Sequence, residues 1–376
     1  MTGSNRRQFV QALGGSALVG SLAGCMGDSG GNGDGEFNQI GLSAYVRGGS
    51  WITAYIEAAE FYAEEIGVEL DVRPNEQSAQ QQVSDIRDMA NQGYDGIIVG
   101  VWDTGAAEGA INDALDEGIP VIATNADSSS SELPLYVGFS NYEGGESCAQ
   151  EMVRSLEEQR GDQDEWDVLN VRGPQGNQSA NQRSQGFLDV MEEDDRVNVR
   201  DTLNGEFARE EAQNVTQQWI NSNDEVDAVY SGNLSMGNGV VRALESLDMD
   251  APKGDDDHVI LTQMDGSGEI NQLVADGVID AAVDQPNYFY NPIAIEYLRA
   301  YHEEGPDAIP EIGDTITPDE LEIQSGNYKD VELWSEPIWS PAEILEQNDH
   351  PWFKTNSIVI TEDNADQPFL WGNVWG

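Results

Sequence analysis

The sequence is poor in the residues that most enzymes and metal sites need. It has 376 residues with two cysteines and three histidines, and neither HExxH nor GxxxxGK[ST] occurs in it. No histidine stands where a Ser-His-Asp or Cys-His arrangement could form at the end of a predicted strand. Two cysteines also exclude a disulfide framework. We therefore expect a protein that is not an enzyme and that needs no metal or other cofactor.

Positive charge is scarce as well. The chain has 17 Lys and Arg against 70 Asp and Glu, which gives a formal net charge of −53. The acidic residues are spread along periodic apolar segments, which argues against an acidic disordered tail. Self-repulsion of this size becomes tolerable at ~1 M salt, where the screening length falls to ~3 Å. The composition therefore indicates a hypersaline setting, and it argues against nucleic acid as a partner because phosphate would be repelled.

The apolar run near the start of the chain is too short to cross a membrane. It extends from Phe9 to Ala23, which is 15 residues, whereas a transmembrane helix needs ~20. Arg6 and Arg7 precede this run, and small residues end it, which is the plan of an export signal. The arginine pair followed by Phe9 resembles a twin-arginine signal, so we expect export across the plasma membrane.

The signal ends in the sequence "LAGC", which resembles a lipobox. In such a motif the chain is cut before the cysteine, here Cys25, and the cysteine is lipidated. We therefore interpret residues 1–24 as the signal and residues 25–36, which include "GDSGGNGDGE", as a flexible linker. A buried N-terminal helix is the alternative interpretation, and the glycine-rich segment that follows at once weighs against it.

From residue 39 onward, strand-like and helix-like stretches alternate. The stretch from residue 50 has apolar side chains at 52, 56, 59, 63 and 66, which is the spacing of one helix face, and Gly67 is placed to end this helix. "YDGIIVGV" is a continuous apolar run, as in a parallel strand covered on both faces. The alternation predicts an α/β fold with parallel sheets flanked by helices.

The same pattern restarts in the second half of the chain, which predicts two Rossmann-like lobes. We assign residues 37–138 and 286–304 to an N-terminal lobe and residues 139–285 to a C-terminal lobe. Residues 305–376 are rich in Pro, Trp and acidic residues, and they break the alternation. We expect this C-terminal extension to form strands and irregular segments that pack mainly on the C-terminal lobe.

Polar and aromatic side chains gather at the predicted carboxyl ends of the strands, where open parallel sheets bind ligands. They include carboxylates, amides, an arginine and flat aromatics, namely Ser43, Tyr45, Arg47, Ser50, Trp51, Trp102, Asp103, Asn125, Asp127, Asn177, Asn181, Arg183, Phe207, Asn233, Asp265 and Gln285. These groups supply both donors and acceptors for hydroxyls, and aromatic faces pack on the C–H faces of a sugar ring. We expect a neutral polyhydroxylated ligand, which leaves pentose, hexose, polyol and nucleoside open.

Four stretches, in order and spacing, resemble a known family. They are residues 91–127, "GNQSANQRSQGF", "DAVYSGNLSMGNGVVRALES" and "QMDGSGEINQLVADGVIDAAVDQ". Residues 37–300 resemble ribose-binding-protein-like substrate-binding lipoproteins of sugar ABC transporters, of the periplasmic-binding-protein type I fold and the halophilic archaeal type. The resemblance implies a monomeric receptor, tethered to the cell surface by lipid, that closes on a sugar about a three-strand hinge and delivers it to an ABC permease.

The resemblance also assigns roles to single residues. Asp265, Asn233 and Gln285 stand where the family has ligand contacts, while Trp51 and Phe207 match aromatics that flank the sugar from opposite lobes.

Two other positions, Asn125 and Asn181, depart from the ribose type, whereas Arg183 does not. Asn125 stands where that type has an aspartate, and Asn181 stands where it has a ligand-binding arginine. Arg183 matches a second arginine nearer the helix core, where a structural ion pair is an equal alternative. These departures argue against ribose itself. Because Ser43, Tyr45, Asp103 and Asp127 share the strand ends, we expect them to be ligand contacts as well.

Three other functions share this fold. A sensory receptor for chemotaxis or signalling stays open from the sequence. A ligand-responsive repressor would need a basic helix-turn-helix, where residues 1–36 carry the predicted signal and linker instead. A nucleoside hydrolase-like enzyme would need a cluster of metal-binding aspartates or a catalytic pair, which the sequence does not show.

Overall fold

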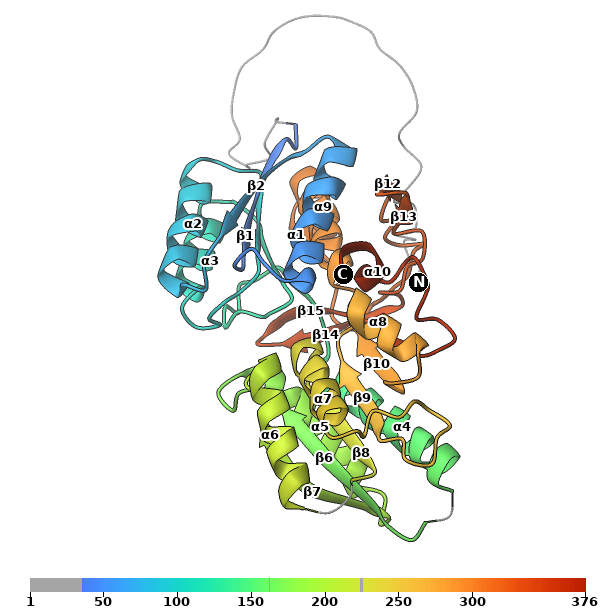
Figure 1. The fold of residues 1–376 in the computed structure, drawn as a ribbon. Helices are drawn as coiled ribbons and strands as arrows, with labels where there is room; N and C mark the ends of the chain where they lie inside the picture. The colour runs from blue at the N-terminus through green and yellow to red at the C-terminus, as the bar shows by residue number, and fades with distance from the viewer. Residues whose placement is uncertain (1–35, 162, 224–225) are drawn as a thin grey trace, which may run out of the picture.

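The computed structural model describes residues 36–161, 163–223 and 226–376. The predicted export signal with Arg6, Arg7 and Cys25 lies outside these residues. The described chain folds into two α/β lobes, each built on its own sheet (Figure 1). The predicted fold class is therefore confirmed. No helix in the described part of the chain combines the length and apolar character that a membrane span requires.

The first lobe has an eight-stranded sheet in the order β11-β14-β15-β5-β4-β3-β1-β2. The strands from β15 to β2 are parallel, and β11, β14 and β15 pair antiparallel. Their bounds are β1 Gln39–Ala44, β2 Glu69–Pro74, β3 Gly96–Val99, β4 Val121–Thr124, β5 Leu135–Phe139, β11 Thr315–Ile316, β14 Ala342–Gln347 and β15 His350–Thr355.

Helices cover both faces of this sheet, as the apolar strand β3 requires. Ile97 and Ile98, adjacent residues of β3, point to opposite faces of the sheet, and each belongs to a different apolar core. The helices on one face are α1 Ser50–Ile66 and α9 Asn287–Glu304, and those on the other are α2 Ala79–Asn91 and α3 Glu108–Asp116 (Figure 1). The predicted end of α1 is confirmed, because Gly67 adopts the left-handed conformation with φ 77°.

The second lobe has a six-stranded sheet in the order β16-β10-β9-β8-β6-β7. The strands are β6 Trp166–Arg172, β7 Val197–Asn204, β8 Ala228–Ser231, β9 Ile260–Met264, β10 Ala281–Asp284 and β16 Ile358–Ile360. One face carries α4 Asn141–Arg160 and α5 Gln178–Glu192, and the other carries α6 Arg209–Ser222, α7 Leu234–Ser246 and α8 Gly268–Ala275. All pairs are parallel except that of β16 with β10.

The chain passes between the two sheets at three places. It leaves β5 for α4, leaves β10 for α9, and leaves β15 for β16. Since β5 and β10 both cross at their carboxyl ends, the carboxyl ends of both parallel sheets lie beside these connections. This topology brings together the edges where the sequence placed the polar side chains.

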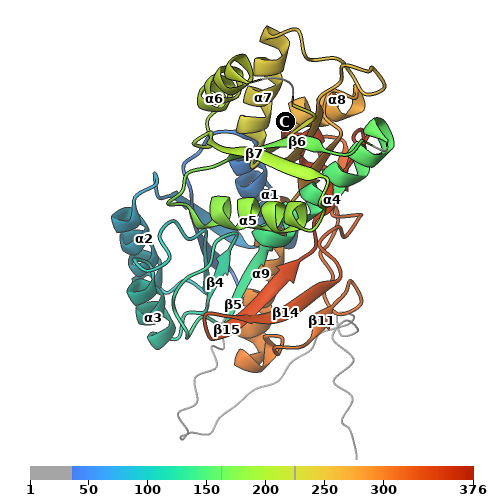
Figure 2. The same ribbon diagram turned by 90° about the horizontal axis from the view of Figure 1, so that it is seen from below.

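The C-terminal extension does not pack mainly on the second lobe, which differs from our expectation. Its strands β11, β14 and β15 extend the first sheet, where β15 pairs with β5 (Figure 2). The hairpin of β12 Gly326–Tyr328 and β13 Val331–Leu333 lies against α1, while β16 pairs with β10 of the second sheet. The physical reason is that both β5 and β10 would otherwise be open sheet edges with unpaired backbone groups.

Candidate functional site

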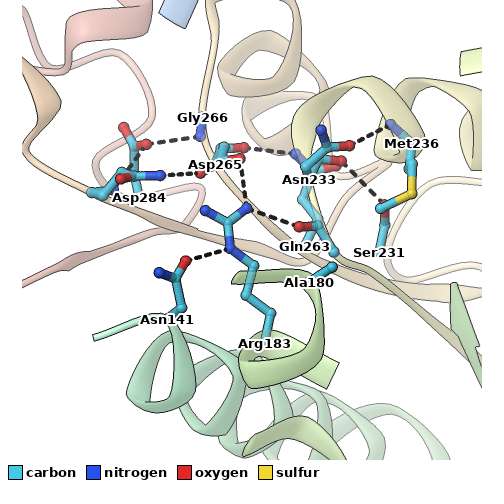
Figure 3. A network of polar contacts seen from close by, with 12 residues as sticks. Asn141, Ala180, Arg183, Ser231, Asn233, Met236, Gln263, Asp265, Gly266 and Asp284 are labelled. Carbon is cyan, nitrogen blue, oxygen red and sulfur yellow. Dashed lines mark hydrogen bonds and ion pairs between the residues drawn. The ribbon is translucent and has the colours of Figure 1, made fainter. Parts of the chain in front are cut away.

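The polar centre of the second lobe is an ion pair between Arg183 on α5 and Asp265, which follows β9. Arg183 Nη1 lies 3.0 Å from Asp265 Oδ2, and the two side chains are 9% and 7% exposed (Figure 3). The same nitrogen donates to the carbonyl of Gly232 at 2.9 Å, and Arg183 Nε donates to Asn141 Oδ1 at 2.8 Å. The guanidinium is thus fixed by three acceptors, one of which is the Asp265 carboxylate.

The second oxygen of Asp265 is held from the connection between β10 and α9. Gln285 Nε2 donates to Asp265 Oδ1 at 2.8 Å, and Tyr290 donates to Gln285 Oε1 at 3.1 Å. Gln263 Nε2 donates to the backbone carbonyl of Asp265 at 2.8 Å. These bonds orient the carboxylate and leave each of its oxygens with a further lone pair, which can accept a hydroxyl.

Asp265 and Asn125 occupy corresponding places in the two lobes. Each follows a central strand, each has a left-handed backbone with φ near 66°, and each donates its N–H to a valine carbonyl of the next strand. A non-glycine residue in this region is uncommon and is often found at functional sites. The two lobes therefore each place one strained polar residue at the carboxyl edge of the sheet.

Aromatic rings dominate the first-lobe side of the site. Trp51 stacks on Tyr55 with ring centroids 5.5 Å apart, and Tyr45 packs edge-on against Trp51 at 6.4 Å and against Trp102 at 6.5 Å. Asn125 Nδ2 donates to the Tyr45 hydroxyl at 2.9 Å. Burial raises the pKa of Tyr45 to about 12, so it stays a neutral phenol. Trp102 is 45% exposed and presents an open indole surface beside this cluster.

Asp284, the last residue of β10, is a buried carboxyl just behind Asp265. Its Oδ1 accepts the backbone N–H groups of Gly266 and Gln285, at 3.0 and 3.1 Å, and the indole N–H of Trp371 at 2.8 Å. Burial raises the pKa of Asp284 to about 7, against the opposing effect of these donors, and the nearby Asp265 raises it further. Asp284 thus anchors the backbone beside the hydrogen-bonded pair Asp265 and Gln285.

The raised pKa of Asp284 predicts a pH-dependent stability. Between the ordinary aspartate pKa of ~3.9 and about 7, the folded protein binds a proton here that the unfolded chain does not, so the free energy of unfolding falls as pH rises. An asparagine side chain in its place keeps an acceptor oxygen and cannot ionise. We therefore expect Asp284→Asn to gain stability relative to the parent protein across this window, measured by denaturant unfolding in molar KCl. A difference that is constant from pH 4 to 8 would contradict the assignment.

The other predicted residues of the second lobe have mixed positions. Asn233 lies at the edge of the Arg183–Asp265 network and caps α7 by accepting the N–H of Met236 at 2.9 Å (Figure 3). The partly buried ring of Phe207 lies against Gly173, where a Cβ would come within 2.3 Å of it. Asn181 is exposed, and its amide contacts Arg172 and the carbonyl of Gln175. The structure thus separates Asn181 from the buried network that contains Arg183.

In the first lobe, three residues that we predicted to contact the ligand form hydrogen bonds with other parts of the protein. Asp127 accepts bonds from His350, Gln347 and Asn348 of the β14–β15 hairpin, at 2.8, 2.7 and 2.8 Å. Asp103 is exposed and accepts the N–H of Ala106 in the turn before α3.

Ser43 is buried at the end of β1, where it accepts from Gln82 at 3.2 Å. These contacts give Asp127, Asp103 and Ser43 structural roles that the sequence did not indicate.

Several residues of the site escaped the sequence analysis. Asn141, which holds Arg183, begins α4 directly after the crossing from β5 and so does follow a strand end. Tyr290 and Asp284 lie in "VDQPNYFY", at the crossing from β10 to α9. The alternation of strands and helices in the sequence indicated where the chain crosses from β10 to α9. The aromatic and acidic residues at this crossing could have identified Tyr290 and Asp284 as candidates. The described residues contain no group of three or more His, Cys, Asp or Glu that could hold a metal ion.

Comparisons with known proteins agree with this architecture. The periplasmic binding protein domain family matches residues 40–305. The ribose import binding protein of Bacillus subtilis is 21% identical over 257 residues, which are 68% of this chain and 79% of that protein. The xylitol-binding protein of Mycolicibacterium smegmatis is 29% identical over 237 residues, which are 62% and 65% of the two chains.

Solved structures show the same fold. An arabinose-binding protein from Geobacillus stearothermophilus superposes with a TM-score of 0.67 at 19% identity, covering 89% of this chain and all of that one. A periplasmic solute-binding protein of an ABC transporter from Actinobacillus succinogenes, with bound D-allose, gives a TM-score of 0.68 at 20% identity, covering 88% and 99%. The two-lobed α/β fold is therefore shared with these proteins.

Proposed function

We infer that this chain, which belongs to the periplasmic binding protein domain family, is an extracytoplasmic receptor that captures a sugar or polyol and delivers it to an ABC permease. The observation that carries the inference is the pairing of two unlike half-sites at the strand ends. One is the buried carboxylate of Asp265 with Arg183, and the other is the aromatic cluster around Tyr45 and Trp51. The first suits hydroxyls and the second suits the C–H face of a ring.

The proposed mechanism is closure of the lobes about the three connections. In an open form the ligand contacts one half-site, and contacts with both half-sites stabilise the closed form. Asp265 accepts ligand hydroxyls, and Gln285 and Asn233 supply amide donors and acceptors beside it. Trp51 and Phe207 face the ligand from the two lobes. The closed form then docks on the permease.

Relatives support the ligand class. The names of the matched proteins refer to ribose, xylitol and galactofuranose, all of which are neutral and rich in hydroxyls. We propose the same chemistry here, with a pentose, hexose or polyol as the ligand. A thermal-shift panel of D-ribose, D-xylose, L-arabinose, D-galactose, xylitol and adenosine in molar KCl tests this. A rise in melting temperature with one sugar or polyol supports the proposal. The proposal is contradicted if adenosine alone raises the melting temperature, or if none of the compounds does.

We also propose that the receptor works as a monomer tethered to the outer face of the plasma membrane through Cys25, after twin-arginine export. A tether keeps the receptor beside its permease. One lipid chain gives only marginal binding, so two chains or additional contacts are needed. The support comes from the sequence of residues 1–25.

Replacing Cys25 tests the anchor. We expect Cys25→Ser receptor, expressed in its natural host, to move from the membrane fraction to the medium, because the serine hydroxyl does not accept the lipid. Cys148→Ser is the matched control, since this buried thiol has a pKa raised by burial and lies outside the signal. Cys25→Ser receptor that stays on the membrane would contradict the anchor.

A further inference from the structure

The last sixteen residues of the chain connect the two lobes at a fourth place. After β16 the segment 361–376 runs to α10, Trp371–Trp375, which contacts both α8 of the second lobe and α1 of the first (Figure 1). The three other connections are covalent crossings of the backbone. This one is built from side-chain contacts, so it can form or break while the chain stays intact.

The segment is anchored on the second lobe by hydrogen bonds and close packing. Trp371 donates to Asp284 at 2.8 Å, and Asn271 of α8 donates to Asn373 Oδ1 at 2.9 Å. Gly372 packs directly on the backbone of Ser267, where an added Cβ would come within 2.6 Å. Trp371 is fully buried. These hydrogen bonds and the close backbone packing fix α10 to the start of α8.

The anchor on the first lobe is the side chain of Trp375. Its indole N–H donates to Glu57 Oε2 of α1 at 3.0 Å, and its ring lies 5.3 Å from that of Tyr328 and 6.0 Å from that of Tyr288. Tyr288, on α9, donates to the carbonyl of Phe369 at 2.7 Å. Glu57 also accepts the Tyr328 hydroxyl, so α1, the β12–β13 hairpin and the C-terminus meet at one carboxylate.

The segment also reaches the candidate ligand site. Asp284, which receives Trp371, holds the backbone N–H groups of Gly266 and Gln285. Gly266 follows Asp265, and Gln285 donates to the Asp265 carboxylate. The position of α10 is therefore linked to the carboxylate that we propose contacts the sugar by three successive hydrogen bonds, from Trp371 to Asp284, from the Gln285 N–H to Asp284, and from Gln285 Nε2 to Asp265.

We propose that residues 361–376 are an interlobe strap that restrains the relative motion of the two lobes and so sets the range of cleft openings. The reason is mechanical: the contacts of Trp375 and Phe369 with the first lobe, or those of Trp371 and Asn373 with the second lobe, must break before α1 and α8 can separate. The proposal concerns the ligand-free protein and stands apart from the identity of the sugar.

Distances between spin labels on the two lobes test the strap in the full mature chain without ligand. Gln80→Cys, in the first turn of α2, and Glu211→Cys, in the first turn of α6, are exposed and lie on different lobes. Cys25→Ser removes one of the two native cysteines, and the other, Cys148, is buried. Trp375→Ala removes the first-lobe anchor. We expect the distance distribution in molar KCl to become broader than that of the labelled parent.

Matched variants separate restraint from a general loss of stability. Glu57→Ala breaks the same anchor from α1 and should broaden the distribution in the same way, so the test survives if Trp375→Ala does not fold. Trp219→Ala changes a partly buried tryptophan of α6 within one lobe and should leave the distribution unchanged. An unchanged distribution in both Trp375→Ala and Glu57→Ala would overturn the proposal, even if their melting temperatures fall.

Discussion

Replacing Asp265 by asparagine should weaken sugar binding by about a hundredfold or more while the receptor stays folded. The carboxylate is the one charged acceptor that the network of Arg183 and Gln285 presents, and hydrogen bonds to a charged group contribute about 1.5–3 kcal/mol each. Two hydroxyl bonds weakened in this way correspond to an affinity loss of about a hundredfold or more. Asparagine also replaces one of the two acceptor oxygens with an NH₂ group, which cannot accept the N–H groups of Arg183 or Gln285. Calorimetric titration with the sugar that gives the largest thermal shift measures the loss.

The choice of substitution matters because Asp265 is buried with Arg183. Alanine would leave the guanidinium unpaired in the interior, which costs about 3–5 kcal/mol and confuses folding with binding. Asparagine also removes the negative charge, but it keeps the shape and an acceptor oxygen for Arg183, so it costs less stability than alanine. Asp194→Asn is the matched control, since it removes the charge from an Arg196 pair of which the arginine is 38% exposed. If Asp265→Asn binds the sugar as tightly as the Asp194→Asn control, the site assignment is wrong.

Transfer from molar salt to ~10 mM salt should unfold the receptor. Its net charge of −53 is unscreened there, because the Debye length grows from ~3 Å to ~30 Å. The Lys and Arg side chains are too few to neutralise the surrounding carboxylates, even where they form ion pairs. Arg154 contacts both Glu151 and Glu158, and Lys354 contacts both Glu143 and Glu343. Because each of these cations contacts two carboxylates, a net negative charge remains, and the carboxylates on the surface still repel one another.

Circular dichroism during stepwise dilution of KCl measures this transition. We expect loss of helical signal and a falling melting temperature as salt decreases, and recovery when salt is restored. Sucrose at equal osmolarity is the control, because it strengthens burial without screening charge. A melting temperature that is undiminished in dilute buffer would refute the halophilic interpretation of the composition.

The alternating part of the fold was predictable because its signals are local. Apolar spacing marked α1, and glycine at residue 67 marked its end. The continuous run around β3 indicated a sheet covered on both faces. The carboxyl ends of these strands then indicated where polar residues collect, and Arg183 and Asp265 do meet there, at a separation of 82 residues.

The rest depends on contacts that no local pattern encodes. The hairpin of β14 and β15 pairs with β5, more than 200 residues earlier, and places His350 against Asp127. Periodicity cannot show which open edge a late strand will cover, so Asp127 looked like a free ligand contact. Trp371 and Trp375 likewise looked like irregular tail residues, although Asp284 and Glu57 receive their indole N–H groups.

A crystal structure of the receptor with the sugar that gives the largest thermal shift tests the central claim most directly. We expect one sugar enclosed between the lobes, with its hydroxyls on Asp265 and Asn233 and its ring face on Trp51. A sugar bound at another place, or held by one lobe without contact to Asp265, would contradict it.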